Sequence, residues 1–154
     1  MYVAVVFGHS ILRWVALLLG AVAVWRALTG QSRGRSWTSA DSAACLAFMI
    51  ALDLQLLVGL VLYVKSPITI LGLHELDLAA RSPALRFFTF IHPVIMLASV
   101  VCAHIAQRRI HSATTDAMRF RSATVFHGLA LALAIAGTPW PFLSYGRPLL
   151  SRRV

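Results

Sequence analysis

Hydrophobic residues in this chain of 154 residues fall into four long runs that are separated by short polar stretches. A helix needs roughly 20 mainly apolar residues to cross the hydrocarbon of a bilayer, because it rises about 1.5 Å per residue. The pattern predicts four membrane-spanning helices, followed by a tail over residues 138–154. The predicted spans cover residues 3–28, 43–64, 85–106 and 117–137.

The polar stretches contain residues that end and begin helices. Residues 29–41 are basic and rich in glycine and serine. Ser66-Pro67 is expected to end the second helix, because proline cannot donate a backbone hydrogen bond. Ser82-Pro83 is expected to open the third helix, with serine as its cap and proline in its first turn. The chain is therefore predicted to be one all-α transmembrane domain, a four-helix bundle.

Composition supports a membrane location. The chain is 59% hydrophobic and 12% charged, whereas soluble domains average roughly 45–50% apolar and about 25% charged residues. The same values exclude a disordered chain, which is poor in apolar residues. The net charge of +9 comes from arginines that flank the apolar runs and meet lipid headgroups. We find no basic stripe with interleaved aromatic residues, so the expected partner is the lipid bilayer and not nucleic acid.

Four crossings would place both termini and the 65–83 loop on one side of the membrane, here called side A. The two short loops would lie on the other side, called side B. Basic residues in short loops favour the cytoplasm, so side B is predicted to be cytoplasmic and both termini non-cytoplasmic. The tail arginines, Arg147, Arg152 and Arg153, oppose this assignment. The side B arginines are Arg26, Arg33, Arg35, Arg108, Arg109, Arg119 and Arg121.

Six ionisable side chains lie within the predicted spans, where such groups are costly and are candidate functional residues. They are His9, Arg13, Asp53, His92, His104 and His127. Counted along the helices, His9 and His92 lie at similar depth towards side A. His104 and His127 lie at similar depth towards side B.

Two histidines at one depth on different helices are what a six-coordinate b-type haem requires, one on each face of the iron. We therefore expect one or two haems, held by His9 with His92 and by His104 with His127. Twelve residues separate His92 from His104, or about 120° around a straight helix, so His92 is expected to face the first helix and His104 the fourth. Histidines that only join helices by hydrogen bonds are the alternative.

The histidines occur in the segments GHSILRW, around His9, and FIHPVIM, around His92, with His104 and His127 further along. Together with the four-span layout, these segments resemble the four-helix membrane b-type cytochromes, a group of small bacterial di-haem proteins. The resemblance implies haem b, electron transfer with quinone across or within the membrane, and the bacterial cytoplasmic membrane as location. It also implies association with other subunits of a respiratory or photosynthetic complex. The second span contains no histidine, so a family that requires one there does not fit.

Two charged residues add to the candidate site. Arg13 lies one helical turn after His9, on the same face, and Asp53 reaches a similar depth on the second span. An ion pair between them is one expectation, because an unpaired charge is costly in the membrane. The other is that Arg13 contacts a haem propionate or a quinone oxygen while Asp53 relays protons.

Two other functions stay open. His92 and Met96 lie one turn apart, and with His9 they offer two imidazoles and a thioether, which suits copper(I). The chain could instead be a cofactor-free structural or accessory subunit of a larger membrane redox complex. It contains no P-loop, dinucleotide fingerprint, nucleophile elbow or H-E-x-x-H motif, so no catalytic residue is predicted.

Overall fold

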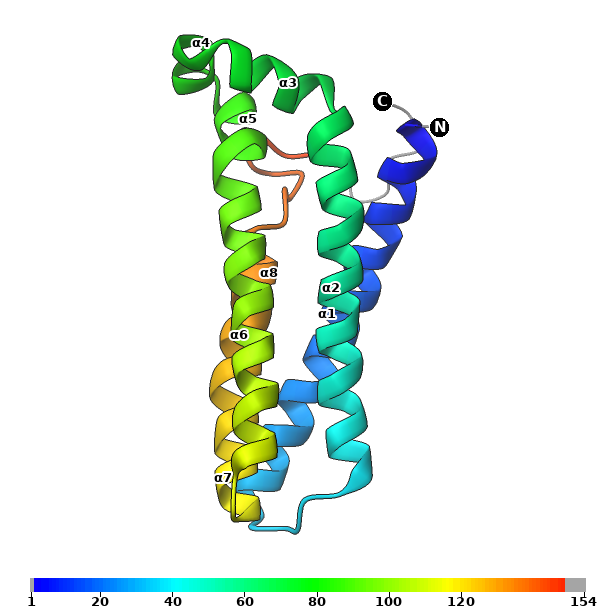
Figure 1. Ribbon diagram of the computed structural model, residues 1–154, viewed down its shortest axis with the longest axis vertical. Coiled ribbons are helices and arrows are strands. Elements are labelled where there is room, and N and C mark those ends of the chain that lie inside the picture. The colour runs from blue at the N-terminus through cyan, green and yellow to red at the C-terminus, as the bar shows by residue number, and fades with distance from the viewer. Residues whose placement is uncertain (1, 149–154) are drawn as a thin grey trace.

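The computed structural model describes residues 2–148, in which helical segments follow one another without any strand (Figure 1). The all-α prediction is confirmed for this part of the chain. Residues 149–154 of the predicted tail, which include Arg152 and Arg153, lie outside the described residues. The segments are α1 (Tyr2–Ser32), α2 (Ser39–Lys65), α3 (Pro67–His74), α4 (Leu76–Arg81), α5 (Pro83–Arg86), η1 (Phe87–Ile91), α6 (His92–Ser112), α7 (Asp116–Ser122), η2 (Ala123–His127) and α8 (Gly128–Ala136).

Within residues 2–148, three helical stretches are long and apolar enough to cross a membrane: α1, α2 and Pro83–Ser112, which α5, η1 and α6 form together. Large hydrophobic side chains cover their outer surface, and the exposed fractions of Leu18, Leu57 and Val94 reach 66%, 60% and 67%. Soluble proteins rarely expose apolar surface on this scale. The chain is therefore an integral membrane protein whose apolar helices fit contact with a lipid bilayer.

The segment over the fourth predicted span is helical without a break from α7 through η2 to α8. It runs beside α6, and it also contacts α1 (Figure 1). Arg119 and Arg121 lie in its first turns, so the strongly apolar part is limited to the later turns.

The predicted 65–83 loop is mostly helical, because α3 and α4 connect α2 to α5 at one end of the molecule (Figure 1). Pro67 begins α3, where its fixed φ suits the first helical turn. The predicted start of the third helix is confirmed at Ser82, whose hydroxyl oxygen accepts a hydrogen bond from the Leu85 amide at 3.4 Å.

Small side chains let the helices approach closely in the core. Phe48 of α2 is one of the largest core side chains and is fully buried. It packs on the backbone of Gly20 in α1, where an added Cβ would lie 2.7 Å from Phe48 Cε2. This contact requires glycine at position 20. The buried alanines include Ala16, Ala23, Ala27, Ala51, Ala103 and Ala130.

A buried carboxylate joins α1 to α2 at the end of the molecule where these two helices are connected. Asp41 is 2% exposed and accepts hydrogen bonds from the amide and the hydroxyl of Thr38, at 2.9 and 2.7 Å. Arg26 Nε donates to it at 3.0 Å, and Arg35 donates through two nitrogens at 2.6 and 2.7 Å. The hydrogen bond to Asp41 raises the pKa of Arg35. The connection between the first two spans is therefore fixed by both a helix cap and a charge cluster.

Candidate functional site

The structure brings together two of the predicted ligands, His9 of α1 and His92 at the start of α6. Their ring centroids lie 6.4 Å apart, with an angle of 70° between the ring planes. Two imidazoles that bind one metal ion from opposite sides, each with a nitrogen about 2.0–2.1 Å from it, have ring centroids roughly 6.3 Å apart. The spacing of the two rings therefore suits ligation of one metal ion between them.

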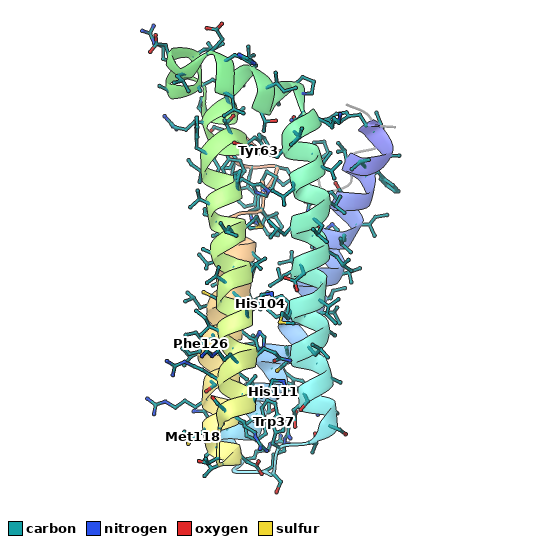
Figure 2. All side chains as sticks on the ribbon, in the orientation of Figure 1. Trp37, Tyr63, His104, His111, Met118 and Phe126 are labelled. Carbon is teal, nitrogen blue, oxygen red and sulfur yellow. The ribbon has the colours of Figure 1, made fainter. Side chains whose placement is uncertain are left out.

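A local break in helical geometry positions His92. Pro93 lacks an N–H, so the carbonyl of Thr89, four residues earlier, has no α-helical partner. The hydroxyl of Tyr63 in α2 donates to that carbonyl oxygen at 3.1 Å (Figure 2 labels Tyr63). The π-helical segment η1 covers this stretch and ends directly before His92. Single π-helical turns are frequent at functional sites.

The hydrogen bond of His92 fixes its tautomer. Its Nδ1 lies 2.8 Å from the carbonyl oxygen of Gly137, just after α8. A carbonyl oxygen only accepts, so Nδ1 is the donor and the neutral ring keeps its lone pair on Nε2. A histidine that ligates a metal usually donates its other ring N–H in this way. The His92 ring is therefore oriented to bind a metal ion through Nε2.

His9 is held by α2, the span that contains no histidine. Gln55 Nε2 donates to the His9 carbonyl oxygen at 3.2 Å and lies 3.1 Å from His9 Nε2. Gly59, one turn along, leaves room for the ring, because an added Cβ would lie 3.3 Å from His9 Cε1. The buried Nδ1 of His9 has no hydrogen-bond partner among residues 2–148. With Gln55 Nε2 as the donor, His9 Nε2 accepts and the neutral ring carries its proton on Nδ1. Ligation through Nδ1 requires that proton to move to Nε2 and the Gln55 amide to turn its Oε1, unpartnered within the described residues, towards it.

Two cavities adjoin the histidine pair and share seven lining residues. The inner cavity, of about 130 Å³, reaches α1 and the segment after α8. The outer cavity, of about 220 Å³, lies between α2 and α6 among leucine, valine and proline side chains. Each is smaller than the roughly 300–1,000 Å³ of a typical ligand pocket. The shared residues are His9, Leu52, Gln55, Gly59, Tyr63, His92 and Met96.

The first part of the predicted tail, residues 138–148, folds back onto the site. The Arg147 amide donates to the Pro139 carbonyl oxygen at 3.1 Å, and Trp140 Nε1 donates to the Ile135 carbonyl oxygen at 3.0 Å. The Arg147 guanidinium lies 4.4 Å from the centroid of the Phe88 ring. Arg147 and Arg13 both line the inner cavity. The site therefore has two cationic side chains near its histidines.

The other two histidines do not form the expected pair. His127 ends η2, is fully buried against Phe48 with ring centroids 5.6 Å apart, and neither ring nitrogen has a partner within the described residues. His104 faces α2 and not the stretch of α7, η2 and α8 that contains His127. Its Nε2 lies 2.9 Å from Asp53 Oδ1. The reason is that Asp53 offers an acceptor at the same depth on the adjacent helix.

The expected ion pair between Arg13 and Asp53 is also wrong. Asp53 pairs with His104 and lines neither cavity at His9, whereas Arg13 lines the inner one. Sequence reasoning missed the roles of Gly137, Tyr63 and Arg147. The His92-Pro93 dipeptide was the one available signal, because proline within a span frees a carbonyl group that another side chain must satisfy.

No protein-family model matches the chain, and comparisons with curated proteins and with solved structures gave no match. The function is therefore inferred from the geometry of the site.

Proposed function

We propose that this protein is a membrane b-type cytochrome, or a cytochrome-like subunit, that binds one haem between His9 and His92. The 6.4 Å spacing of the two rings is the observation that supports this proposal most strongly. The proposal is for one haem, because His104 bonds to Asp53 while His127 packs on Phe48. Bound haem would supply reversible one-electron chemistry, which serves electron transfer within or across the membrane.

The residues present fit a haem in three respects. His92 keeps a lone pair on Nε2, and His9 would offer one on Nδ1 once its proton moves to Nε2 and the Gln55 amide turns to accept it. His9 and His92 line both cavities, so a group held by these two residues would adjoin each cavity. The haem carries two carboxylates, and guanidinium groups of the inner cavity are suitable partners for them. The cavities must widen to admit a macrocycle, since each is small.

The surrounding side chains would control the bound group. The Gly137 carbonyl orients the His92 ring, and Gln55 orients the His9 ring. Apolar residues of α2 and α6 form most of the lining of the outer cavity. A quinone is the proposed redox partner, because it dissolves in the bilayer and little of this chain lies outside the apolar helices.

Copper(I) is the second candidate. Met96 lines both cavities together with His9 and His92, so a thioether is available beside the two imidazoles. A single ion would also need less widening of the cavities than a haem.

The test is purification of the full chain from membranes, with metal analysis and a reduced-minus-oxidised absorption spectrum. We expect about one iron per chain and low-spin haem bands, both lost in His9→Ala and in His92→Ala. His104→Ala and His74→Ala, a change at the last residue of α3, serve as matched controls that retain the haem. Copper without iron would favour the second candidate. A protein without either metal would support the cofactor-free subunit.

We further propose that the continuous helical stretch of α7, η2 and α8 is a fourth membrane span and completes a four-helix bundle. Both termini would then lie on the non-cytoplasmic side of a bacterial cytoplasmic membrane. Tyr2 and Pro148 line the same cavity, as an even number of crossings requires. Association with other subunits of a respiratory or photosynthetic complex is part of this proposal. In intact cells, an impermeant thiol reagent should label a cysteine at Glu75 and not one at Thr114. Labelling of the two positions in the reverse order would contradict the orientation.

A further inference from the structure

The hydrogen-bonded pair of Asp53 and His104 is not used in the proposed function. It joins α2 to α6 through the 2.9 Å contact between Oδ1 and Nε2. The two side chains are 35% and 53% exposed, and Figure 2 shows His104 between α6 and α2. The pair therefore lies at the surface of the molecule and not in its core.

The depth of this pair in the membrane is unusual. Asp53 is near the middle of α2, fourteen residues from Ser39 and twelve from Lys65. At about 1.5 Å per residue it lies roughly 18–21 Å from either helix end. Arg108 is exposed one turn after His104, and the other exposed side chains near the pair on the two helices are apolar. They include Leu54, Leu57, Val101 and Ile105.

Lipid hydrocarbon cannot satisfy the hydrogen-bonding groups of this pair. Lipid chains offer no hydrogen bonds, and ionisable side chains in spans normally face protein or water. The contact between the two residues uses one oxygen and one nitrogen. Asp53 Oδ2 and His104 Nδ1 have no hydrogen-bond partner in the part of the chain that the structure describes. Another polar surface is needed to cover these two atoms.

We propose that two copies of this chain pack together through α2 and α6, about a two-fold axis beside the Asp53–His104 pair. A pair with no net charge has one free donor at Nδ1 and one free acceptor at Oδ2, whichever of the two groups holds the proton shared between Oδ1 and Nε2. A two-fold axis sets the donor of each copy against the acceptor of the other, because the same patch is used twice. A purely apolar helix would leave both atoms unsatisfied.

The first test measures the mass of the purified full chain in mild detergent and in lipid nanodiscs. We expect a dimer, and a roughly tenfold rise in its dissociation constant in Asp53→Asn and in His104→Phe. Asp116→Asn and His111→Phe make the same chemical changes elsewhere and should leave the dimer unchanged. The exchange of both residues, Asp53→His with His104→Asp, should preserve it. A monomeric wild type, or a dimer indifferent to both single variants, overturns the proposal.

A cross-linking test keeps the polar pair intact and so does not depend on variants that could misfold. In a chain without Cys45 and Cys102, Val101→Cys lies one turn before His104 and should form a disulfide between copies on oxidation. Val125→Cys, equally exposed on η2, should not. Equal cross-linking of both variants, or of neither, overturns the proposal. Neither test requires a bound haem, so this inference and the proposed function can fail separately.

Discussion

His92 donates a hydrogen bond from Nδ1 to the carbonyl oxygen of Gly137, 2.8 Å away. The residue that directly follows α8 therefore orients the imidazole ring at the start of α6. Both groups are polar and lie in an apolar part of the molecule. The contact satisfies a carbonyl group at the end of a helix and sets the tautomer of the histidine in one step. Changes at position 137 should therefore affect both stability and the candidate site.

Gly137→Ala adds a methyl group where Met96 already packs and where Ile95 Cγ2 would lie 3.0 Å away. We expect the free energy of unfolding to fall by about 1–3 kcal/mol and haem retention to fall with it. Loss of helical circular dichroism during a titration with sodium dodecyl sulfate measures the first effect. Gly128→Ala is the matched control, because its added Cβ meets open space. An equal loss in both variants would contradict the expectation.

Tyr63→Phe removes the hydroxyl that satisfies the Thr89 carbonyl. The expected cost in unfolding free energy is about 0.5–1.5 kcal/mol. In a Pro93→Ala background, the new amide at position 93 can donate a hydrogen bond to the Thr89 carbonyl oxygen. The loss of unfolding free energy caused by Tyr63→Phe should then be smaller. The four proteins form a double-mutant cycle, measured by the same titration. Additive effects would show that the two groups do not share the carbonyl.

Gly20→Ala places a methyl group against the buried ring of Phe48. Because the ring is fully enclosed, we expect a loss of about 1–3 kcal/mol in unfolding free energy. Gly8→Ala in the same helix meets nothing within 4 Å and should be neutral or slightly stabilising. Thermal unfolding in detergent compares the two variants. A Gly8→Ala variant as unstable as Gly20→Ala would refute this account of the core.

Asp41→Asn removes the charge that holds Arg26 and Arg35. We expect a loss of about 1–3 kcal/mol, less than for a fully buried ion pair because both arginines are partly exposed to solvent. Asp116→Asn breaks an exposed pair with Arg119 and should cost at most about 0.5 kcal/mol. Unfolding titrations at low and high salt measure both. A cost at Asp41 that is no larger than at Asp116 would argue against a structural role for the cluster.

The sequence predicted the all-helical architecture, the start of the third helix at Ser82-Pro83 and the approach of His9 to His92. Hydropathy and residue counting report depth along a helix, and for these features depth was sufficient. Hydropathy and residue counting do not show in which direction a side chain points around its helix. His104 turned towards Asp53, and Arg13 towards the inner cavity, because neighbours on other helices decide these contacts.

The π-helical turns and the folded segment 138–148 were also missed. Each π-helical turn changes the phase of the side chains that follow it, and hydrophobic periodicity does not report such a local change. The segment 138–148 contains prolines and glycine and has no regular period. Its position depends on contacts such as Arg147 with Phe88, which bring together residues far apart in the chain.

The bond between His92 and Gly137 also bears on the order of events during biosynthesis. A chain emerging from the ribosome inserts its first three apolar helices before position 137 is available. The imidazole at position 92 then has no fixed orientation, and its two nitrogens are equivalent candidates for a proton. Loading of the proposed haem is therefore expected to follow translation of α8, so that chains truncated before Gly137 would reach the membrane without haem.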